Sequence, residues 1–172
     1  MALDQRLAAL ELMLFDVDGI LTDNGLYIGE SGDLLKRFDV RDGAGLKLAQ
    51  MAGLRVGLIS GHDSTATVRR AAQLGIDICH VGVKDKIPVF ENTLKQTGVP
   101  RERVLYMGDD VMDLPLLSRA GVAVTVPEAP ALIRDRCDFV TRARGGFGAV
   151  RETVERVLTA MGRMDDIVQR FL

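Results

Sequence analysis

The chain has 172 residues, of which 47% are hydrophobic and 27% are charged, a composition typical of one globular domain with an ordinary core. A net charge of −2 and the lack of tryptophan argue against a nucleic-acid surface, and no apolar run is long enough to span a membrane. Two cysteines make no disulfide framework and no export signal is recognisable, so we expect a cytoplasmic protein.

Short apolar runs alternate with helical patterns along the chain. The runs predicted as core strands are 12–15, 55–59, 76–81, 103–107 and 122–126, with a strand remnant at 139–140. The segments predicted as helices are 43–52, 64–74, 85–97, 112–119 and 149–161, the first of them capped by Asp42. This alternation predicts an α/β fold with a doubly wound, mostly parallel sheet. We expect one domain over residues 1–172, with a polar tail at 162–172.

A small β-hairpin is predicted directly after the first strand, as an insertion at about 24–40. Asn24-Gly25 is a strong tight-turn signal, and a glycine-rich turn at 29–32 separates two apolar arms at 26–28 and 34–40. A two-stranded hairpin is marginally stable by itself. We therefore expect it to lie against another surface, either of its own domain or of another subunit.

The first predicted strand ends at two carboxylates, in the run Phe-Asp-Val-Asp-Gly that contains Asp16 and Asp18. Ligands of open α/β sheets bind outside the carboxyl ends of the strands, and two close carboxylates repel each other without a cation. Mg²⁺, which prefers oxygen ligands, is the simplest candidate. The alternative is an Asx-rich turn with no chemical role.

Polar residues also follow three further strands. Ser60, Gly61 and His62 close the second strand, Lys86 lies just after the third, and the fourth ends in the acidic group Asp109, Asp110 and Asp113. Because strand carboxyl ends converge on one crevice, these side chains are expected to meet Asp16 and Asp18. Each has an alternative reading: Ser60 could end a strand, Lys86 could be solvated, and the aspartates could cap a helix.

Phosphoryl transfer is the chemistry that this set can support. Asp16 is predicted to attack phosphorus, and Asp18 to protonate the leaving oxygen and then deprotonate the hydrolytic water. Mg²⁺ would be held by Asp16, Asp18 and Asp109 and would neutralise charge on the transferring group. Ser60, Gly61 and Lys86 would bind phosphate oxygens, and Asp110 and Asp113 would support the site, with Asp113 orienting Lys86 or a metal-bound water.

These motifs resemble the haloacid dehalogenase superfamily of aspartate-nucleophile phosphatases. The stretch Asp-Val-Asp-Gly-Ile-Leu-Thr-Asp matches its first motif, Leu-Ile-Ser-Gly the second, Lys86 the third and Gly-Asp-Asp-Val-Met-Asp the fourth. No large cap insertion is present. The runs Phe-Asp-Val-Arg-Asp-Gly-Ala-Gly at 38–45 and Gly-Gly-Phe-Gly-Ala-Val-Arg-Glu at 145–152 resemble the capless subgroup that contains the octulosonate 8-phosphate phosphatases of lipopolysaccharide precursor synthesis.

The resemblance to that subgroup implies a Mg²⁺-dependent hydrolase of an acidic sugar phosphate. It also implies a homotetramer assembled through the hairpins, with neighbouring subunits completing each active site. The tail at 162–172 is then expected to reach a neighbour's site. Neither a nucleic acid nor a membrane is expected as a partner.

One departure from the subgroup concerns the sugar. The octulosonate phosphatases typically carry arginine after the second motif, where this chain has His62, and neutral histidine cannot pair bidentately with a carboxylate. Arg41, Arg69 and Arg70 are the remaining candidate carboxylate binders, although a solvated helix face also explains the last two. A nonulosonate 9-phosphate phosphatase, a generalist phosphatase and a non-catalytic assembly module therefore stay as alternatives.

Overall fold

A six-stranded parallel sheet forms the centre of the computed structural model, which describes residues 1–30 and 34–172. Its strand order is β5-β4-β1-β6-β7-β8, and every neighbouring pair is parallel. The strands are β1 (Leu12–Phe15), β4 (Arg55–Ile59), β5 (Ile78–His80), β6 (Val104–Met107), β7 (Val122–Thr125) and β8 (Phe139–Val140). The chain runs outward from β1 to β5 and then returns to β6 on the other side of β1. The topological switch point, where α/β sheets bind ligands, therefore lies between β1 and β6.

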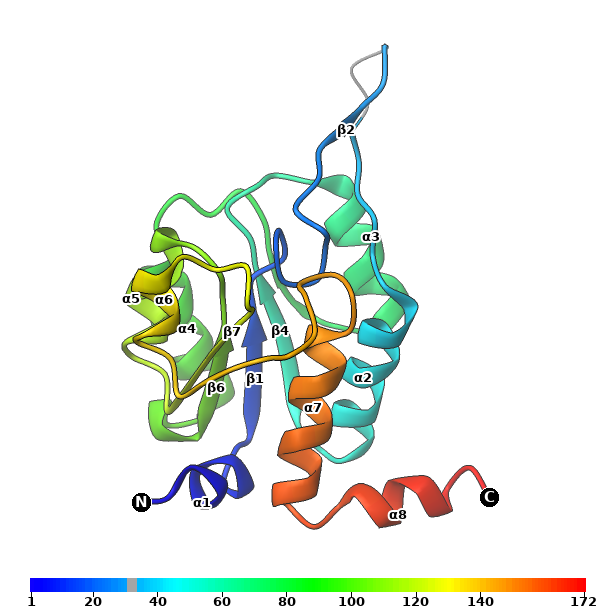
Figure 1. Cartoon of the computed structure of the whole chain (residues 1–172), viewed down its shortest axis with the longest axis vertical. Coiled ribbons are helices and arrows are strands. Elements are labelled where there is room, and N and C mark those ends of the chain that lie inside the picture. The colour runs from blue at the N-terminus through cyan, green and yellow to red at the C-terminus, as the bar shows by residue number, and fades with distance from the viewer. Residues whose placement is uncertain (31–33) are drawn as a thin grey trace.

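Helices cover both faces of the sheet (Figure 1). One group contains α2 (Val40–Met51), α3 (Thr65–Leu74) and α7 (Ala149–Ala160), and α2 packs against the other two. The second group contains α4 (Lys86–Thr97), α5 (Leu114–Leu117) and α6 (Ala131–Arg134), with α1 (Leu3–Ala8) below the sheet. The doubly wound fold predicted from the sequence is confirmed. Strand β1 is enclosed between the two layers, and its side chains are all buried.

Most predicted elements are present with shorter ends, because the final residues of each run lie in loops. Helix α3 shows the predicted signals well: the Ser64 hydroxyl accepts the N–H of Thr67, and Gly75 ends the helix with φ of 63°. The segment predicted as one helix at 112–119 is instead a 3-10 turn, Val111–Asp113, followed by α5. The short turn sets the direction in which Asp113 enters the site.

The predicted hairpin projects from the sheet's carboxyl end, well away from the rest of the domain (Figure 1). Strands β2 (Tyr27–Ile28) and β3 (Leu34–Leu35) pair antiparallel, and Thr22 bridges to Phe38 at the base. Part of the predicted turn at 29–32 lies outside the described residues. The arms carry exposed apolar side chains: Ile28 is 69% exposed and Leu35 is 63% exposed. Such side chains on a projecting hairpin mark a surface that another chain could cover.

The boundary between the hairpin and α2 was predicted wrongly. The second arm ends at Leu35 rather than continuing to residue 40, and α2 begins at Val40. Its cap is Asp39, whose carboxylate accepts the N–H of Arg41 at 2.7 Å, and not Asp42. Asp42 is fully buried and instead accepts the N–H groups of Gly148 and Arg151 at 3.1 and 2.9 Å. It therefore caps α7, a helix more than a hundred residues away in the chain.

The polar tail at 162–172 contains a helix that the sequence analysis did not assign. Helix α8 (Met164–Gln169) packs against α7, and its Ile167 is only 2% exposed. Met164, Ile167, Val168 and Phe171 follow the i, i+3, i+4, i+7 spacing of an amphipathic helix, which was the available signal. Within the described ranges, no helix combines the length and apolarity needed to cross a bilayer.

Candidate active site

The residues after β1 form a tight loop at the carboxyl end of the central strand. The carbonyl of Val17 accepts the N–H groups of Ile20, Leu21 and Thr22, which coils the chain immediately after Asp16. Gly19 has φ of 81°, and a Cβ there would lie 2.0 Å from a carboxylate oxygen of Asp109. Glycine is therefore required both for the backbone conformation and for the close approach of Asp109 to the loop.

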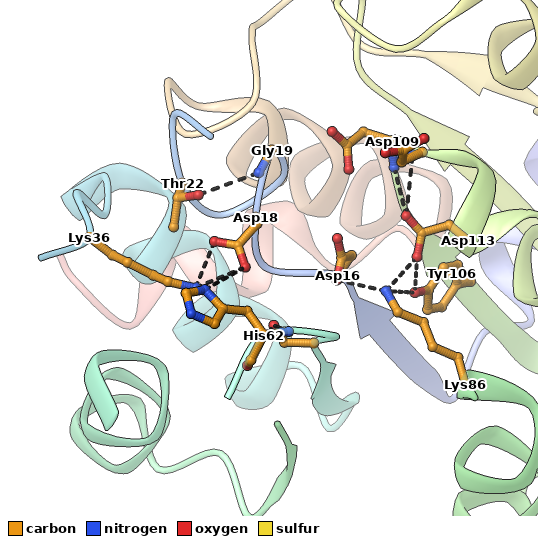
Figure 2. Close-up of polar contacts among 12 residues, drawn as sticks. Asp16, Asp18, Gly19, Thr22, Lys36, His62, Lys86, Tyr106, Asp109 and Asp113 are labelled. Atoms are coloured by element: carbon orange, nitrogen blue, oxygen red, sulfur yellow. Dashed lines mark hydrogen bonds and ion pairs between the residues drawn. The ribbon is translucent and has the colours of Figure 1, made fainter. Parts of the chain in front are cut away.

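Asp16 points into a buried ion-pair network with Lys86 (Figure 2). The Lys86 ammonium donates to Asp16 Oδ1 at 2.8 Å and to Asp113 Oδ1 at 2.7 Å. Lys86 begins α4, which Asp85 caps, and its side chain is only 6% exposed. The alternative reading of Lys86 as a solvated charge is therefore wrong. A buried ammonium between two carboxylates at this point is suited to holding an anionic phosphoryl group.

Asp113 organises the second acidic group through four hydrogen bonds. Its Oδ1 accepts from Lys86 and from the Tyr106 hydroxyl, the latter at 2.6 Å. Its Oδ2 accepts the N–H groups of Asp109 and Asp110 at 3.1 and 3.3 Å. The predicted contact between Asp113 and Lys86 is present. Because both of its oxygens already accept two donors, Asp113 holds the loop and the lysine in place and has little capacity left for a ligand.

Burial and mutual repulsion raise the pKa values of two carboxyls at the centre of the site. The pKa of Asp16 rises to about 7, mainly through burial and then through the charge of Asp113, although Lys86 opposes the change. The pKa of Asp109 also rises to about 7, through burial and then through Asp16 and Asp113. Burial alone would lower the pKa of Lys86, but the two carboxylates outweigh it and the pKa rises. The site therefore holds more negative charge than Lys86 can neutralise.

A divalent cation suits this excess of buried carboxylate. Oxygens of Asp16, Asp109 and Asp113 all lie within 4.8 Å of one another. Such oxygens are the ligands that Mg²⁺ prefers, and Mg²⁺ commonly binds through only one or two carboxylates. Asp16 and Asp109 have free lone pairs for this purpose, whereas those of Asp113 are engaged. The residues present therefore fit the Mg²⁺ expected from the sequence.

Asp18 lies apart from this cluster and faces the opposite way (Figure 2). Its two carboxylate oxygens accept from Lys36 Nζ at 2.7 and 2.8 Å, and Oδ2 lies 4.0 Å from Nδ1 of His62. Among the described residues, the clustered carboxylates are those of Asp16, Asp109 and Asp113, so the Asp18 side chain is not placed as a metal ligand. The metal-ligand role predicted for Asp18 therefore stays a prediction. The carboxylate lies at the cavity, where acid–base chemistry on a bound substrate would take place.

A cavity of about 220 Å³ opens between the two aspartates at the switch point. The residues that line it are Asp16, Asp18, Asn24, Gly61, His62, Val83, Lys86, Asp109, Asp110, Met112 and Asp113. Eight of the residues predicted for the site, His62 among them, are thus brought from four strand ends to one opening. Its walls carry both the acidic cluster and the ammonium of Lys86, as expected for an anion held beside a metal.

Ser60 and the arginines lie differently from what the sequence suggested. Ser60 is fully buried, and its hydroxyl accepts the N–H of His62 at 3.2 Å, a contact that shapes the loop after β4. Arg41 pairs with Asp39 at 3.0 Å and its side chain is 67% exposed. Neither Arg41, Arg69 nor Arg70 is among the described residues that line the cavity. A direct contact with phosphate through Ser60 and a carboxylate contact through these arginines stay predictions.

The glycine-rich run at 145–152 packs against the first loop. The N–H of Gly146 donates to the Ile20 carbonyl at 2.8 Å, and a Cβ at Gly145 would lie 1.7 Å from the Gly19 carbonyl oxygen. Arg37, at the base of the hairpin, donates to the Gly146 carbonyl and lies 4.2 Å from the centre of the Phe147 ring. This run therefore supports the loop that carries both predicted catalytic aspartates.

Three functional neighbours were missed by the sequence analysis. Tyr106 lies inside an apolar strand, and its position one residue before the strand end was the available signal. Asn24 lines the cavity but had been assigned only to a turn. Lys36 reaches Asp18 from the hairpin, and no local pattern distinguishes it from a solvated lysine. Lys36 is placed by its contact with Asp18, and Tyr106 by its contacts with Lys86 and Asp113.

Comparison with known proteins identifies the family. The sequence model of the haloacid dehalogenase-like hydrolases matches residues 49–150. The 3-deoxy-D-manno-octulosonate 8-phosphate phosphatase KdsC of Escherichia coli K12 is 38% identical over 157 residues, which cover 91% of this chain and 84% of that protein. The enzyme of the same name from Haemophilus influenzae is 37% identical, over 99% of this chain and 96% of its own length.

Solved structures agree with the sequence relatives. The 3-deoxy-D-manno-octulosonate 8-phosphate phosphatase of Moraxella catarrhalis, in complex with magnesium ion, phosphate ion and KDO (3-deoxy-D-manno-octulosonate), superposes with a TM-score of 0.95 at 34% identity. The superposition covers 98% of this chain and 97% of that one. The resemblance expected from the sequence motifs is confirmed, and the chain belongs to the haloacid dehalogenase-like hydrolase family.

Proposed function

We propose that this protein is a Mg²⁺-dependent phosphatase that hydrolyses 3-deoxy-D-manno-octulosonate 8-phosphate to octulosonate and phosphate. The observation that carries the proposal is the different surroundings of Asp16 and Asp18 in one cavity. Asp16 lies in a buried cluster with Lys86, while Asp18 faces the other side of the same cavity. The extended similarity to octulosonate 8-phosphate phosphatases supports the choice of substrate.

The first step forms a bond between Asp16 and phosphorus. An Asp16 oxygen attacks phosphorus, the bond to the sugar oxygen breaks, and Asp18 gives its proton to that leaving oxygen. Lys86 and the N–H groups of the loop would hold the non-bridging phosphoryl oxygens. Asp113 fixes the direction of Lys86 through the 2.7 Å bond. The product of this step is the free sugar and an aspartyl-phosphate.

The second step returns the enzyme to its starting state. A water molecule loses a proton to Asp18 and attacks phosphorus, and the bond between phosphorus and the Asp16 oxygen breaks. Phosphate leaves and Asp16 is again a carboxylate. Asp18 therefore acts as acid and then as base at one position, which requires that its side chain stay on the side of the leaving group.

Mg²⁺ would be held by the carboxylates of Asp16 and Asp109, with Asp113 supporting their loop. When bound, it neutralises the charge that builds up between these carboxylates and the phosphoryl group. The similar Moraxella enzyme is described in complex with magnesium and phosphate ions. The raised pKa values of Asp16 and Asp109 in the metal-free site follow from the same crowding of charge.

Mg²⁺ affinity is expected to fall as the pH is lowered through about 7. The metal-free carboxyls of Asp16 and Asp109 have pKa values raised to about 7, so protons compete with Mg²⁺ below this pH. Between about pH 8 and about pH 6 the apparent dissociation constant should rise by roughly tenfold or more, with protons released on binding. Isothermal titration calorimetry in two buffers of different ionisation enthalpy measures both quantities. Affinity that is independent of pH, with no proton release, would contradict the proposed ligands.

Substrate selection is tested by phosphate release from a small panel with Mg²⁺ present. The panel holds octulosonate 8-phosphate, a nonulosonate 9-phosphate, a hexose 6-phosphate and p-nitrophenyl phosphate. We expect octulosonate 8-phosphate to be preferred by about a hundredfold in kcat/KM, on the order of 3 kcal/mol. A preference for the nonulosonate 9-phosphate would show that the site with His62 selects that sugar instead. A flat profile would indicate a generalist, and no release from any member would favour the non-catalytic assembly module.

We further propose that the hairpin assembles a homotetramer of single-domain subunits. Its exposed apolar side chains, Tyr27, Ile28 and Leu35, support this role. Deletion of residues 26–38, or the double variant Ile28→Asp with Leu35→Asp, should reduce the mass measured by light scattering to about a quarter, because the apolar contact is lost. Val68→Asp, which alters an exposed apolar residue of α3, is the matched control. A tetramer that survives both hairpin variants would refute the assembly role.

The same proposal places the protein in the cytoplasm. Cys79 and Cys137 are free thiols, which suits a reducing compartment. Arg69, which is exposed on α3, remains a candidate for binding the substrate carboxylate. The tail at 162–172 remains a candidate for contacting the active site of a neighbouring subunit. The tail could make this contact only in the tetramer, where Arg69 would also act.

A further inference from the structure

The two aspartates of the first loop each have a lysine of their own. Asp16 pairs with Lys86 of α4, and Asp18 pairs with Lys36, which follows the second strand of the hairpin. Lys36 approaches Asp18 from the side opposite to Lys86 (Figure 2). Although only Val17 separates them in sequence, the two carboxylates are thus drawn in different directions.

The pair between Lys36 and Asp18 is well enclosed and bidentate. Lys36 Nζ lies 2.7 and 2.8 Å from the two Asp18 oxygens, so both oxygens are held by one donor. The Lys36 side chain is 1% exposed, whereas that of Asp18 is 28% exposed. Burying an ammonium is costly unless it is paired, so the contact with Asp18 is the partner that offsets this cost. A bidentate contact also restricts rotation of the carboxylate.

The consequence concerns the place of Asp18 in the reaction. A carboxylate on a flexible side chain beside a divalent-cation site would be attracted toward the cation and away from the leaving group. In this structure, Asp18 remains outside the cluster of Asp16 and Asp109 and lies beside His62 at the rim of the cavity. Proton transfer to a leaving oxygen requires the donor within hydrogen-bond reach of it.

We propose that Lys36 is a positioning residue that holds Asp18 on the leaving-group side of the cavity. This inference rests on the proposed phosphatase function and adds a residue to it. Lys36 lies between β3 and α2, so the position of the hairpin is linked to the position of the proton donor. Assembly through the hairpin would then hold the subunits together and also fix the position of the Asp18 side chain.

The test compares two leaving groups in the variant Lys36→Met, which keeps the length of the side chain and removes its charge. An alkyl phosphate such as octulosonate 8-phosphate needs a proton on its leaving oxygen, whereas p-nitrophenolate leaves without one. The parameter kcat/KM depends only on the steps up to and including the first irreversible one. The hydrolysis of the aspartyl-phosphate, which both substrates share, therefore does not affect the comparison. We expect a loss of at least about thirtyfold with the sugar phosphate and less than about threefold with p-nitrophenyl phosphate.

Two further variants sharpen this comparison. Lys36→Arg keeps a donor fork for the carboxylate and should retain most of the sugar-phosphate activity. Lys47→Met changes an exposed lysine of α2 and should leave both substrates unaffected. Equal losses with both substrates, or no loss with either, would overturn the role of Lys36.

A structural measurement keeps the inference separate from the proposed function. If the wild-type enzyme released no phosphate from either substrate, the proposed function would fail, but the position of Asp18 could still be tested. In a crystal structure of Lys36→Met, we expect the Asp18 carboxylate to have turned from its place beside His62. An Asp18 side chain that stays in the same rotamer, 4.0 Å from His62 as in this structure, would overturn the positioning role.

Discussion

The variant Asp16→Asn is expected to lose turnover almost completely, with kcat/KM reduced by at least about 10⁴-fold. Asparagine has nearly the shape of aspartate and can still accept from Lys86, but its amide oxygen is a poor nucleophile toward phosphorus. Phosphate release with octulosonate 8-phosphate measures the loss. Asp77→Asn, an exposed carboxylate between α3 and β5, is the matched control and should keep full activity.

The fold of Asp16→Asn should be intact. The pKa of the folded Asp16 carboxyl is about 7, above its ordinary value of 3.8, so its charged form destabilises the metal-free fold above that pH. The neutral amide removes this penalty, and the metal-free thermal midpoint near pH 8 should equal or exceed that of the wild type. Activity within about tenfold of the wild type, in a folded variant free of contaminating phosphatase, would refute the role of Asp16 as nucleophile.

The variant Lys86→Met is expected to have the second largest effect, on both activity and stability. The substitution removes the Lys86 ammonium, which lies 2.8 Å from Asp16 and 2.7 Å from Asp113. Breaking a buried ion pair on one side typically costs about 3 kcal/mol of unfolding free energy, and here proton uptake by the raised carboxyls offsets part of it. Removing a charged phosphate contact should also lower kcat/KM by roughly 10³-fold.

Urea unfolding near pH 8, with and without Mg²⁺, measures the stability of Lys86→Met. We expect the loss to be large without Mg²⁺ and partly recovered when Mg²⁺ is added, because the cation neutralises the same carboxylates. Lys95→Met, an exposed lysine of the same helix, is the control and should change the free energy of unfolding by no more than about 0.5 kcal/mol. Equal stability of the two variants would show that Lys86 is not part of the charge balance.

The predictable part of this protein is local in the sequence. Apolar runs that stop at Asp16, Ser60 and Asp109 indicated the strands, and parallel topology brings their ends together at one edge. Glycines and capping residues such as Ser64 marked the helix boundaries. The site could be predicted to the extent that each residue's position follows from the end of a strand.

The parts that were missed depend on contacts between distant segments. Asp42 looked like a cap for its own helix but caps α7, because α2 and α7 lie side by side. The pair between Asp18 and Lys36 of the hairpin could not be predicted, and the metal-ligand role of Asp18 stays a prediction. The bond between the Ser60 hydroxyl and the backbone of His62 was likewise not predicted, and a phosphate contact through Ser60 stays a prediction. No local sequence pattern predicts which residue a hairpin side chain contacts, or whether a hydroxyl points into the protein or into the cavity.

The central claim is that Asp16 itself becomes phosphorylated, and chemical trapping tests this most directly. Enzyme quenched with borohydride during turnover of octulosonate 8-phosphate with Mg²⁺ would have its acyl phosphate reduced, and peptide mass spectrometry would locate the change. We predict homoserine at position 16, absent when substrate is omitted and absent in Asp16→Asn. An unmodified Asp16 in enzyme that is turning over, or a modification at Asp18 or Asp109 instead, would contradict the mechanism.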